Sequence, residues 1–261
     1  MLEILKNNFR DILKGKWLLV YPLFFVFASI GFFELTSTPS KNLVSLLNLI
    51  VIFLPLISLM FGTFYFYNSR KFMELLLTNP VSRKAVFWGN YLGVSFSLCA
   101  GFILGLAPAI ILYLIRSPQE IPILLIMVLS GTLLTFSFTA FAVLITTLFE
   151  DRSKGFGFSV LIWLYVSLIH DGIILTVTVL FSRYPVGRIV MALSFLNPVG
   201  LARILILLRL DISAVMGYTG AVLEEFFGKS EGMIMAASGL VLWILLPLLL
   251  SQVLFQKKDL G

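Results

Sequence analysis

The sequence predicts an all-α membrane protein with six transmembrane helices, and three observations lead to that prediction. Of its 261 residues, 59% are hydrophobic and 12% are charged, whereas soluble domains are about 45–50% apolar and about 25% charged. The apolar residues fall into long runs that match the roughly 20 residues needed to cross a bilayer. Basic residues flank those runs, as they do in membrane proteins with a fixed orientation. The chain is therefore expected to fold in lipid rather than in water.

The N-terminal residues predict an amphipathic helix on the membrane surface. Leu2, Leu5, Phe9 and Leu13 recur at helical spacing, with polar and basic residues between them. A basic amphipathic helix of this kind binds an anionic lipid surface. The segment is too charged for a cleaved signal peptide, so we expect the apolar run that follows it to be a retained span.

Six apolar runs are expected to cross the membrane, and together they predict a single transmembrane domain over 1–261. The predicted spans are residues 17–33, 45–67, 86–115, 121–149, 155–181 and 232–255. Residues 183–231 differ from the spans, because charged residues break their apolar pieces into lengths too short to cross. We interpret 183–231 as interfacial helices and a loop on the periplasmic side.

The distribution of lysine and arginine predicts that both termini lie in the cytoplasm. An even number of spans agrees with this orientation, and the net charge of +6 is then a signal of orientation, not of nucleic-acid binding. The cytoplasmic set is Lys6, Arg10, Lys14, Lys16, Arg70, Lys71, Arg83, Lys84, Arg152, Lys154, Lys257 and Lys258. The smaller outer set is Lys41, Arg116, Arg183, Arg188, Arg203, Arg209 and Lys229.

The sequence lacks the motifs of several enzyme classes. It has no GxxxxGK[ST] phosphate loop, no HExxH pair and no nucleophile elbow. Its only histidine is His170 and its only cysteine is Cys99, so a multi-histidine metal site, a serine triad and a disulfide cannot form within the chain. We therefore expect a non-catalytic membrane subunit that binds no cofactor and no nucleic acid.

Residues 69–84, SRKFMELLLTNPVSRK, form a polar-framed segment between the second and third predicted spans. Ser69 is expected to cap a short helix, and Pro80 to end it, because the residue before a proline avoids the helical conformation. Ser82 can cap the helix that follows. A helix across the membrane surface could act as a lever on two spans, although a simple connecting helix fits the same residues. The apolar face of this helix would be Phe72, Leu75 and Leu76, and its exposed face Arg70, Lys71 and Glu74.

The run that begins at Met73, MELLLTNPVSRKAVFWGNYLG, resembles the family of ABC-2 type permeases. In that family a cytoplasmic loop of the form LL-x-x-P-x-S/G-R precedes the third span. The runs FLPLISLMFG, WLYVSLIHDGIIL and LNPVGLARIL extend the similarity, which is greatest to the branch that serves nitrous-oxide reductase maturation. In one departure, Asn68-Ser69-Arg70-Lys71-Phe72 stands where family members carry an acidic run, with only Glu74 retained.

This resemblance implies a homodimer in the bacterial inner membrane that works with two copies of a separate ATPase, which would hold ATP and Mg. It also implies contact with a periplasmic repeat protein and a role in assembling a copper–sulfur centre. The residues implied in coupling to the ATPase are Ser69, Arg70, Lys71, Phe72, Glu74, Leu75, Leu76, Pro80, Arg83 and Lys84. Those implied in contact with the outer partner are Asn197, Pro198, Arg203 and Arg209, and the arginines could instead meet lipid headgroups.

His170 and Asp171 lie within the fifth predicted span. An ionisable group inside a span is costly and normally has a function or a partner. The two could serve cargo, a proton relay or weak copper binding, or they could face protein or water at a helix end. Because adjacent helical residues point in different directions, they would interact only indirectly.

Three interpretations follow for function. The first is a permease subunit of an ABC complex for copper–sulfur centre maturation. The second is an ABC-2 permease for another cargo, such as a lipid, a drug or a gliding-machinery component. The third is an intramembrane enzyme or membrane scaffold without an ATPase, and an ATPase that co-purifies would exclude it.

Overall fold

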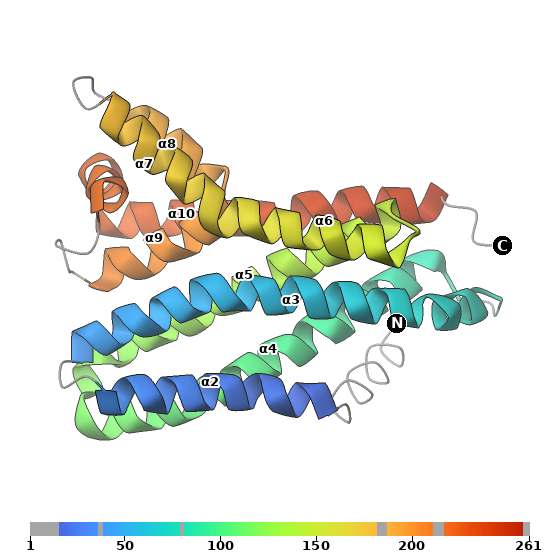
Figure 1. Cartoon of the computed structure of the whole chain (residues 1–261), viewed down its shortest axis with the longest axis horizontal. Coiled ribbons are helices and arrows are strands. Elements are labelled where there is room, and N and C mark those ends of the chain that lie inside the picture. The colour runs from blue at the N-terminus through green and yellow to red at the C-terminus, as the bar shows by residue number, and fades with distance from the viewer. Residues whose placement is uncertain (1–15, 36–38, 79–80, 182–186, 211–216, 258–261) are drawn as a thin grey trace.

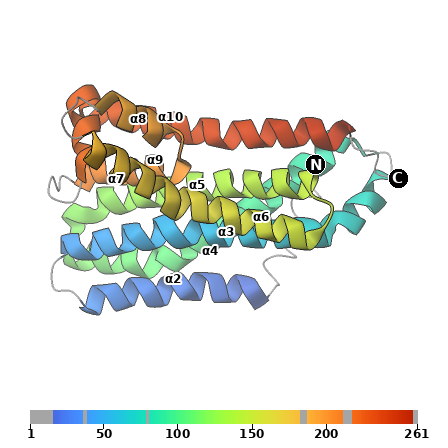
Figure 2. The same ribbon diagram turned by 45° about the horizontal axis from the view of Figure 1, so that its top comes forward.

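Helices make up nearly all of the structure, a computed structural model that describes residues 16–35, 39–78, 81–181, 187–210 and 217–257 (Figure 1). No strand occurs in these residues. The long helices run alternately in opposite directions and form a bundle with two ends (Figure 2). The all-α prediction is confirmed for the described part of the chain.

Five helical stretches are long and apolar enough to cross a membrane. They are α3 (Pro39–Leu77), α4 (Arg83–Arg116), α5 (Ile121–Leu148), the series α6 (Arg152–Leu164), η2 (Tyr165–Ile169) and α7 (His170–Leu180), and α10 (Gly217–Lys257). The last five predicted spans fall on these stretches. The first falls on α2 (Lys16–Leu35), a helix of 20 residues that contains the apolar section Val20–Phe32.

Helix α5 lies in the middle of the bundle and packs against α3, α4, α9 and α10. Small polar side chains join it and its neighbours: the Ser95 and Thr139 hydroxyls lie 2.8 Å apart, and the Tyr91 hydroxyl donates to the Phe136 carbonyl at 3.0 Å. Because lipid gives apolar helices little reason to associate, such hydrogen bonds and close contacts hold membrane bundles together.

The region between the fifth span and the last helix differs from its prediction. Helices α8 (Gly187–Phe195) and α9 (Pro198–Leu210) meet at an angle of 111°. Helix α9 was expected to be interfacial, but it is buried along most of its length and packs against α5 and α10. If the bent pair α8–α9 counts as one span, the described residues hold six candidate spans.

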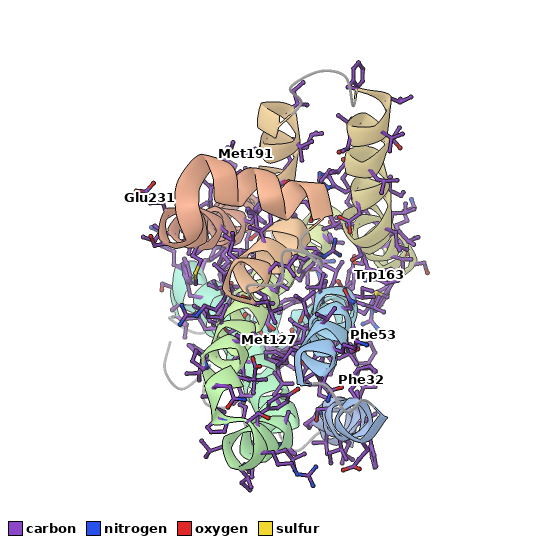
Figure 3. All side chains as sticks on the ribbon, turned by 90° about the vertical axis from the view of Figure 1, so that its left-hand side faces the viewer. Phe32, Phe53, Met127, Trp163, Met191 and Glu231 are labelled. Atoms are coloured by element: carbon purple, nitrogen blue, oxygen red, sulfur yellow. The ribbon has the colours of Figure 1, made fainter. Side chains whose placement is uncertain are left out.

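The fifth span is interrupted near its middle by the π turn η2, in which the His170 N–H donates to the Tyr165 carbonyl. Just before the turn, the Trp163 indole donates to the Ile52 carbonyl of α3 at 3.0 Å, which fixes α6 to the bundle (Figure 3). After the turn, α7 diverges and packs beside α8. π turns are rare and often mark functional sites.

Candidate functional site

One end of the bundle collects basic residues from four separate parts of the sequence. Helix α3 ends there, α4 begins, α5 leads into α6, and α10 ends (Figure 1). Three contacts join these parts: Arg70 lies 3.7 Å from Glu150, Arg152 donates to Asn68 at 3.1 Å, and Arg83 donates to the Gln256 carbonyl at 3.3 Å. We call this region the basic end, defined by Arg70, Lys71, Arg83, Lys84, Arg152, Lys154 and Lys257.

The segment 69–84 differs from its prediction in one respect. No separate helix starts at Ser69, because α3 continues without a break from Pro39 to Leu77. The Ser69 hydroxyl does not cap; it donates back to the Phe66 carbonyl at 3.3 Å. A load on residues 69–77 would therefore act on the second span directly, through one continuous helix.

The end of the segment agrees with its prediction. Helix α3 ends at Leu77, and Pro80 lies outside the described residues. Ser82 caps α4, since its hydroxyl accepts from the Ala85 N–H at 3.3 Å. The two spans are thus separated by a short connection.

Two large apolar side chains of the segment point away from the bundle. Phe72 is 47% exposed and Leu75 is 66% exposed, and Lys71 beside them is also exposed. The side chains of Glu74 and Leu76 lie outside what the structure describes. Large exposed apolar groups among charges at the end of a membrane bundle are typical of a surface that binds another protein.

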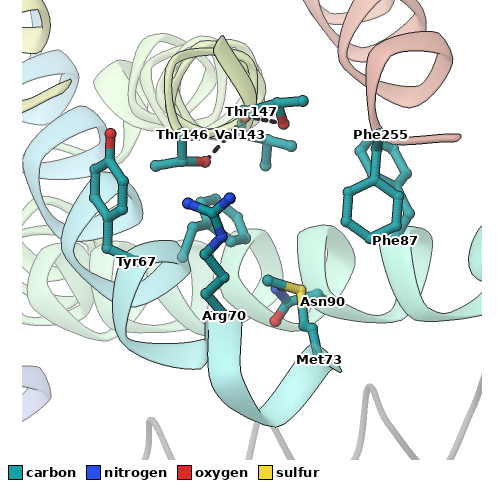
Figure 4. Close-up of a pocket in the computed structure, with 10 residues that line it drawn as sticks. Tyr67, Arg70, Met73, Phe87, Asn90, Val143, Thr146, Thr147 and Phe255 are labelled. Carbon is teal, nitrogen blue, oxygen red and sulfur yellow. Dashed lines mark hydrogen bonds between the residues drawn. The ribbon is translucent and has the colours of Figure 1, made fainter. Parts of the chain in front are cut away.

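Behind the segment is a narrow crevice with about 590 Å³ of empty space, part of it open to solvent (Figure 4). Asn90 of α4 forms part of its wall and donates to the Ser69 hydroxyl at 3.4 Å and to the Met73 sulfur at 3.0 Å. Asn90 thus holds the last turns of α3 against α4. The role of Asn90 was not predicted from the sequence. An asparagine in an apolar run indicates that a polar contact exists, but it does not indicate which residue is the partner. The lining is Phe66, Tyr67, Arg70, Met73, Phe87, Asn90, Val143, Thr146, Thr147 and Phe255.

The base of the segment is also fixed to the start of the fifth span. The Tyr67 hydroxyl donates to the carbonyl of Phe149 at 2.8 Å and to that of Asp151 at 3.3 Å. Gly155 packs against the Tyr67 ring so closely that a methyl group there would overlap it. The sequence predicted Tyr67 only as part of an aromatic belt. Its contact with Gly155 could not be predicted, because no local pattern pairs the two residues.

Near the middle of the fifth span, away from the basic end, the residues of the π turn and the start of α7 are joined to α9 and the residue before it by two contacts that we call the latch. Arg203 of α9 forms an ion pair with Asp171, and both side chains are only about one-third exposed. Asn197 is buried; its amide donates to the Val166 carbonyl within the π turn at 2.8 Å, and its oxygen accepts from the Val199 N–H at 2.9 Å. Asp171 and Arg203 have separate roles in the prediction from sequence, and the structure brings them together.

His170 does not take part in the ion pair. It is 2% exposed, and neither ring nitrogen has a hydrogen-bond partner; the nearby Ser167 hydroxyl likewise lacks one. Within the described residues, no three His, Cys, Asp or Glu side chains come together as a metal site. A cargo or proton role for His170 therefore stays a prediction.

The four residues predicted to meet an outer partner differ in exposure. Asn197 and Pro198 are buried, and Arg203 is occupied by Asp171. Arg209 is exposed. Of the four, Arg209 is the most accessible in this structure.

The sequence was compared with known proteins. Residues 2–260 match the family described as ABC-2 family transporter protein. Two similar curated proteins are each named "Probable ABC transporter permease protein NosY". The one from Pseudomonas aeruginosa is 26% identical over 82% of this chain and 84% of its own length. The one from Stutzerimonas stutzeri is 25% identical over 98% of both chains.

Proposed function

This chain belongs to the ABC-2 family of transporter proteins, and on that premise we propose that its segment 69–84 receives force from a separate ATPase subunit. ABC-2 permeases are normally non-catalytic membrane subunits, so ATP and Mg would be held by that partner. The proposed coupling residues are those predicted from the sequence, from Ser69 to Lys84.

The continuity of α3 is the observation that carries this proposal. One helix runs through the second span and on to Leu77, where it presents Phe72 and Leu75. An ATPase that binds these side chains would pull on the span with no flexible joint between them. Asn90 and Tyr67 would pass the displacement to α4 and to the start of α6.

The orientation is part of the proposal. We infer that the basic end faces the cytoplasm, because it gathers the lysines and arginines of the predicted cytoplasmic set. Helix α2 begins and α10 ends at the same end of the bundle, which supports cytoplasmic placement of both termini (Figure 1). The chain would then be one multi-pass domain, 1–261, of a bacterial inner membrane.

The finer proposal is a role in maturation of nitrous-oxide reductase, as part of a homodimer that meets a periplasmic repeat protein. Its support is the similarity to two proteins named NosY and the motifs shared with that branch. Stretches α6–α7 and α10 are buried over only 17% and 22% of their apolar windows, against 44–56% in α3, α4 and α5. That apolar surface could take a second copy. Export of another cargo, such as a lipid or a drug, is the alternative.

Affinity purification in mild detergent tests the proposal. The wild-type chain should bring down an ATP-binding protein in equal amount, and Leu75→Asp should lose it while the chain still inserts in the membrane. Leu148→Asp is the matched control, since Leu148 is an exposed leucine at the same end of the bundle but on α5. Retention of the ATPase by Leu75→Asp would show that segment 69–84 is not the coupling surface.

If no ATPase co-purifies with the wild-type chain, a scaffold or intramembrane enzyme replaces the proposal. Among the proteins that do co-purify, a repeat protein from the periplasm supports the maturation role. Its absence favours a permease for another cargo.

A further inference from the structure

The end of α3 projects beyond the rest of the bundle. Its last turns and the start of α4 extend past the start of α6 and the end of α10 (Figures 1 and 2). Leu75 lies eight residues after Tyr67 on one continuous helix, which at 1.5 Å per residue is about 12 Å along the axis. Tyrosines at a helix end mark the membrane–water interface, and the headgroup layer is only about 5–8 Å thick. In the proposed orientation, Leu75 therefore lies beyond the lipid headgroups.

Three exposed side chains share one surface of this projection. Phe72 and Leu75 are exposed and three residues apart, and the exposed Lys71 is four residues before Leu75. Residues three and four apart are neighbours on the surface of a helix. The projection thus presents an apolar centre with a cation at its edge. Protein interfaces have the same arrangement, with an apolar core and a polar rim.

The positive charge of the segment 69–84 exceeds its negative charge. The segment contains Arg70, Lys71, Arg83 and Lys84 but only one acidic residue, Glu74. Lys71 and Lys84 are both exposed, and neither has an ion pair or a side-chain hydrogen bond with another described residue. Glu74 can neutralise only one of the four charges, so the segment keeps a positive excess.

The acidic residues of the neighbouring loop do not remove this excess. Glu150 lies 3.7 Å from Arg70. The Asp151 carboxylate accepts from the Ser153 N–H at 2.8 Å and caps α6. Both acidic side chains are therefore engaged away from Lys71.

The start of α4 adds further positive charge. Helix α4 begins six residues after α3 ends, and its first turn contains Arg83 and Lys84 but no acidic residue. A helix N-terminus carries about half a positive elementary charge, so cations there are unfavourable unless an anionic group approaches. Arg83 donates to the Gln256 carbonyl at 3.3 Å. Lys84 remains exposed, and it is placed to meet an anionic group from outside the chain.

We propose that the ATPase subunit binds this projection through an acidic surface. An apolar pocket of the partner takes Phe72 and Leu75, and carboxylates at the rim of that pocket contact Lys71 and Lys84. This inference rests on the proposed function and adds the chemistry of the partner's surface. The apolar pair sets how long the complex lasts, because loss of buried anchors acts on dissociation. The lysines set how fast the complex forms, since charges at a rim steer association.

Binding kinetics test the inference. The ATP-binding protein that co-purifies with the wild-type chain is purified and passed over the immobilised full chain in mild detergent. In 0.1 M salt, Lys71→Glu and Lys84→Glu should each slow association about threefold and together about tenfold, with little change in dissociation. Lys41→Glu is the matched control, because Lys41 is an exposed lysine at the opposite end of α3. It should bind as the wild-type chain does.

Salt distinguishes an effect of charge from a structural defect. The Debye length falls from about 10 Å at 0.1 M to about 3 Å at 1 M salt. The difference between the double lysine variant and the wild type should therefore shrink to less than about twofold at 1 M. Leu75→Ala should instead dissociate about tenfold faster at both salt concentrations, because loss of an apolar anchor is not screened. A tenfold deficit of the lysine variant that persists at 1 M salt would overturn the inference.

The outcomes also separate this inference from the proposed function. If Leu75→Asp loses the ATPase while both lysine variants associate as fast as the wild type, the segment is the coupling surface but its partner is not acidic. The lysines would then be assigned to the membrane surface, and the inference would be wrong. Faster association of the lysine variants would indicate a basic partner surface, which also contradicts it. If Leu75→Asp still binds the ATPase, the proposed function fails, and the inference fails with it.

Discussion

The basic end and the latch hold their charged groups in opposite ways. At the basic end, the Arg70–Glu150 contact is 3.7 Å long and Glu150 is 71% exposed. At the latch, Asp171 and Arg203 are in direct contact, and Asp171 is 32% exposed, less than half the value of Glu150, while the two arginines are about equally exposed. Beside them, the amide and the oxygen of Asn197 are both hydrogen-bonded inside the protein. The first arrangement can change partners at low cost, whereas the second cannot be opened without leaving a poorly solvated charge.

This contrast fits the proposed function, in which the basic end binds a partner and the latch keeps a fixed internal geometry. Helix α3 runs from Leu77 back through the second span to Pro39, with Pro55 in its interior, so under the proposed function a displacement at Leu75 would be carried along one helix. The π turn is the place where such motion meets a fixed point, because Asn197 and Arg203 tie it to α9. We therefore expect variants at the latch to cost more stability than variants at the basic end.

The largest effect is expected from breaking the ion pair of the latch. Asp171→Ala should lower the free energy of unfolding by about 2 kcal/mol, below the 3–5 kcal/mol of a fully buried pair because both groups are partly exposed. Thermal unfolding of the purified chain in mild detergent measures this. The double variant Asp171→Leu, Arg203→Met should recover part of the loss, since it removes both charges. A double variant as unstable as the two single variants combined would show that the two residues do not act as a pair.

The next largest effect is expected where the second and fifth spans touch. Gly155→Ala should destabilise the chain by about 1–3 kcal/mol, the usual cost of overpacking, because the added methyl group overlaps Tyr67. Gly157→Ala is the matched control, since a methyl group there meets nothing within 4 Å. That control should be neutral or stabilising by up to about 1 kcal/mol. The same thermal assay applies, and equal stability of the two variants would mean that the Tyr67 contact is not tight.

Variants of Asn197 distinguish its two hydrogen bonds, one to the π turn and one that caps α9. Asn197→Ala removes the cap of α9 and the bond to Val166, and should cost about 1–2 kcal/mol. Asn197→Asp keeps an oxygen for Val199 but cannot donate to Val166. If the π turn depends on that donor, the aspartate variant should be about as unstable as the alanine variant. An aspartate variant with wild-type stability would assign the asparagine to capping alone.

Much of the fold could be predicted from the sequence, because its signals are local. Five apolar runs gave the long spans, Pro80 placed the end of α3, and Ser82 placed the start of α4. The role of Ser69 was predicted wrongly because a serine hydroxyl can either cap a helix or donate back to the preceding turn. The neighbouring residues do not distinguish the two arrangements. In the structure, the extended end of α3 is held by a contact between Asn90 and Met73, which are 17 residues apart in the sequence.

The latch could not be predicted for a similar reason. The run ILILL between the charged residues Arg203 and Arg209 looked interfacial because it is too short to cross a membrane. Asp171, 32 residues earlier, compensates that charge, and α9 can then be buried. The π turn has no local signal in this sequence, since the Val166 carbonyl within it is hydrogen-bonded by Asn197, which lies between α8 and α9.

The smallest change in the free energy of unfolding is expected at the ion pair of the basic end. Glu150→Gln should change the free energy of unfolding by less than about 0.5 kcal/mol, because an exposed contact of 3.7 Å contributes little. Thermal unfolding in low and high salt should give the same small difference. A loss as large as that of Asp171→Ala would mean that Arg70 is held as firmly as Arg203. The basic end would then be a second fixed point, and it could not adapt to a partner as we propose.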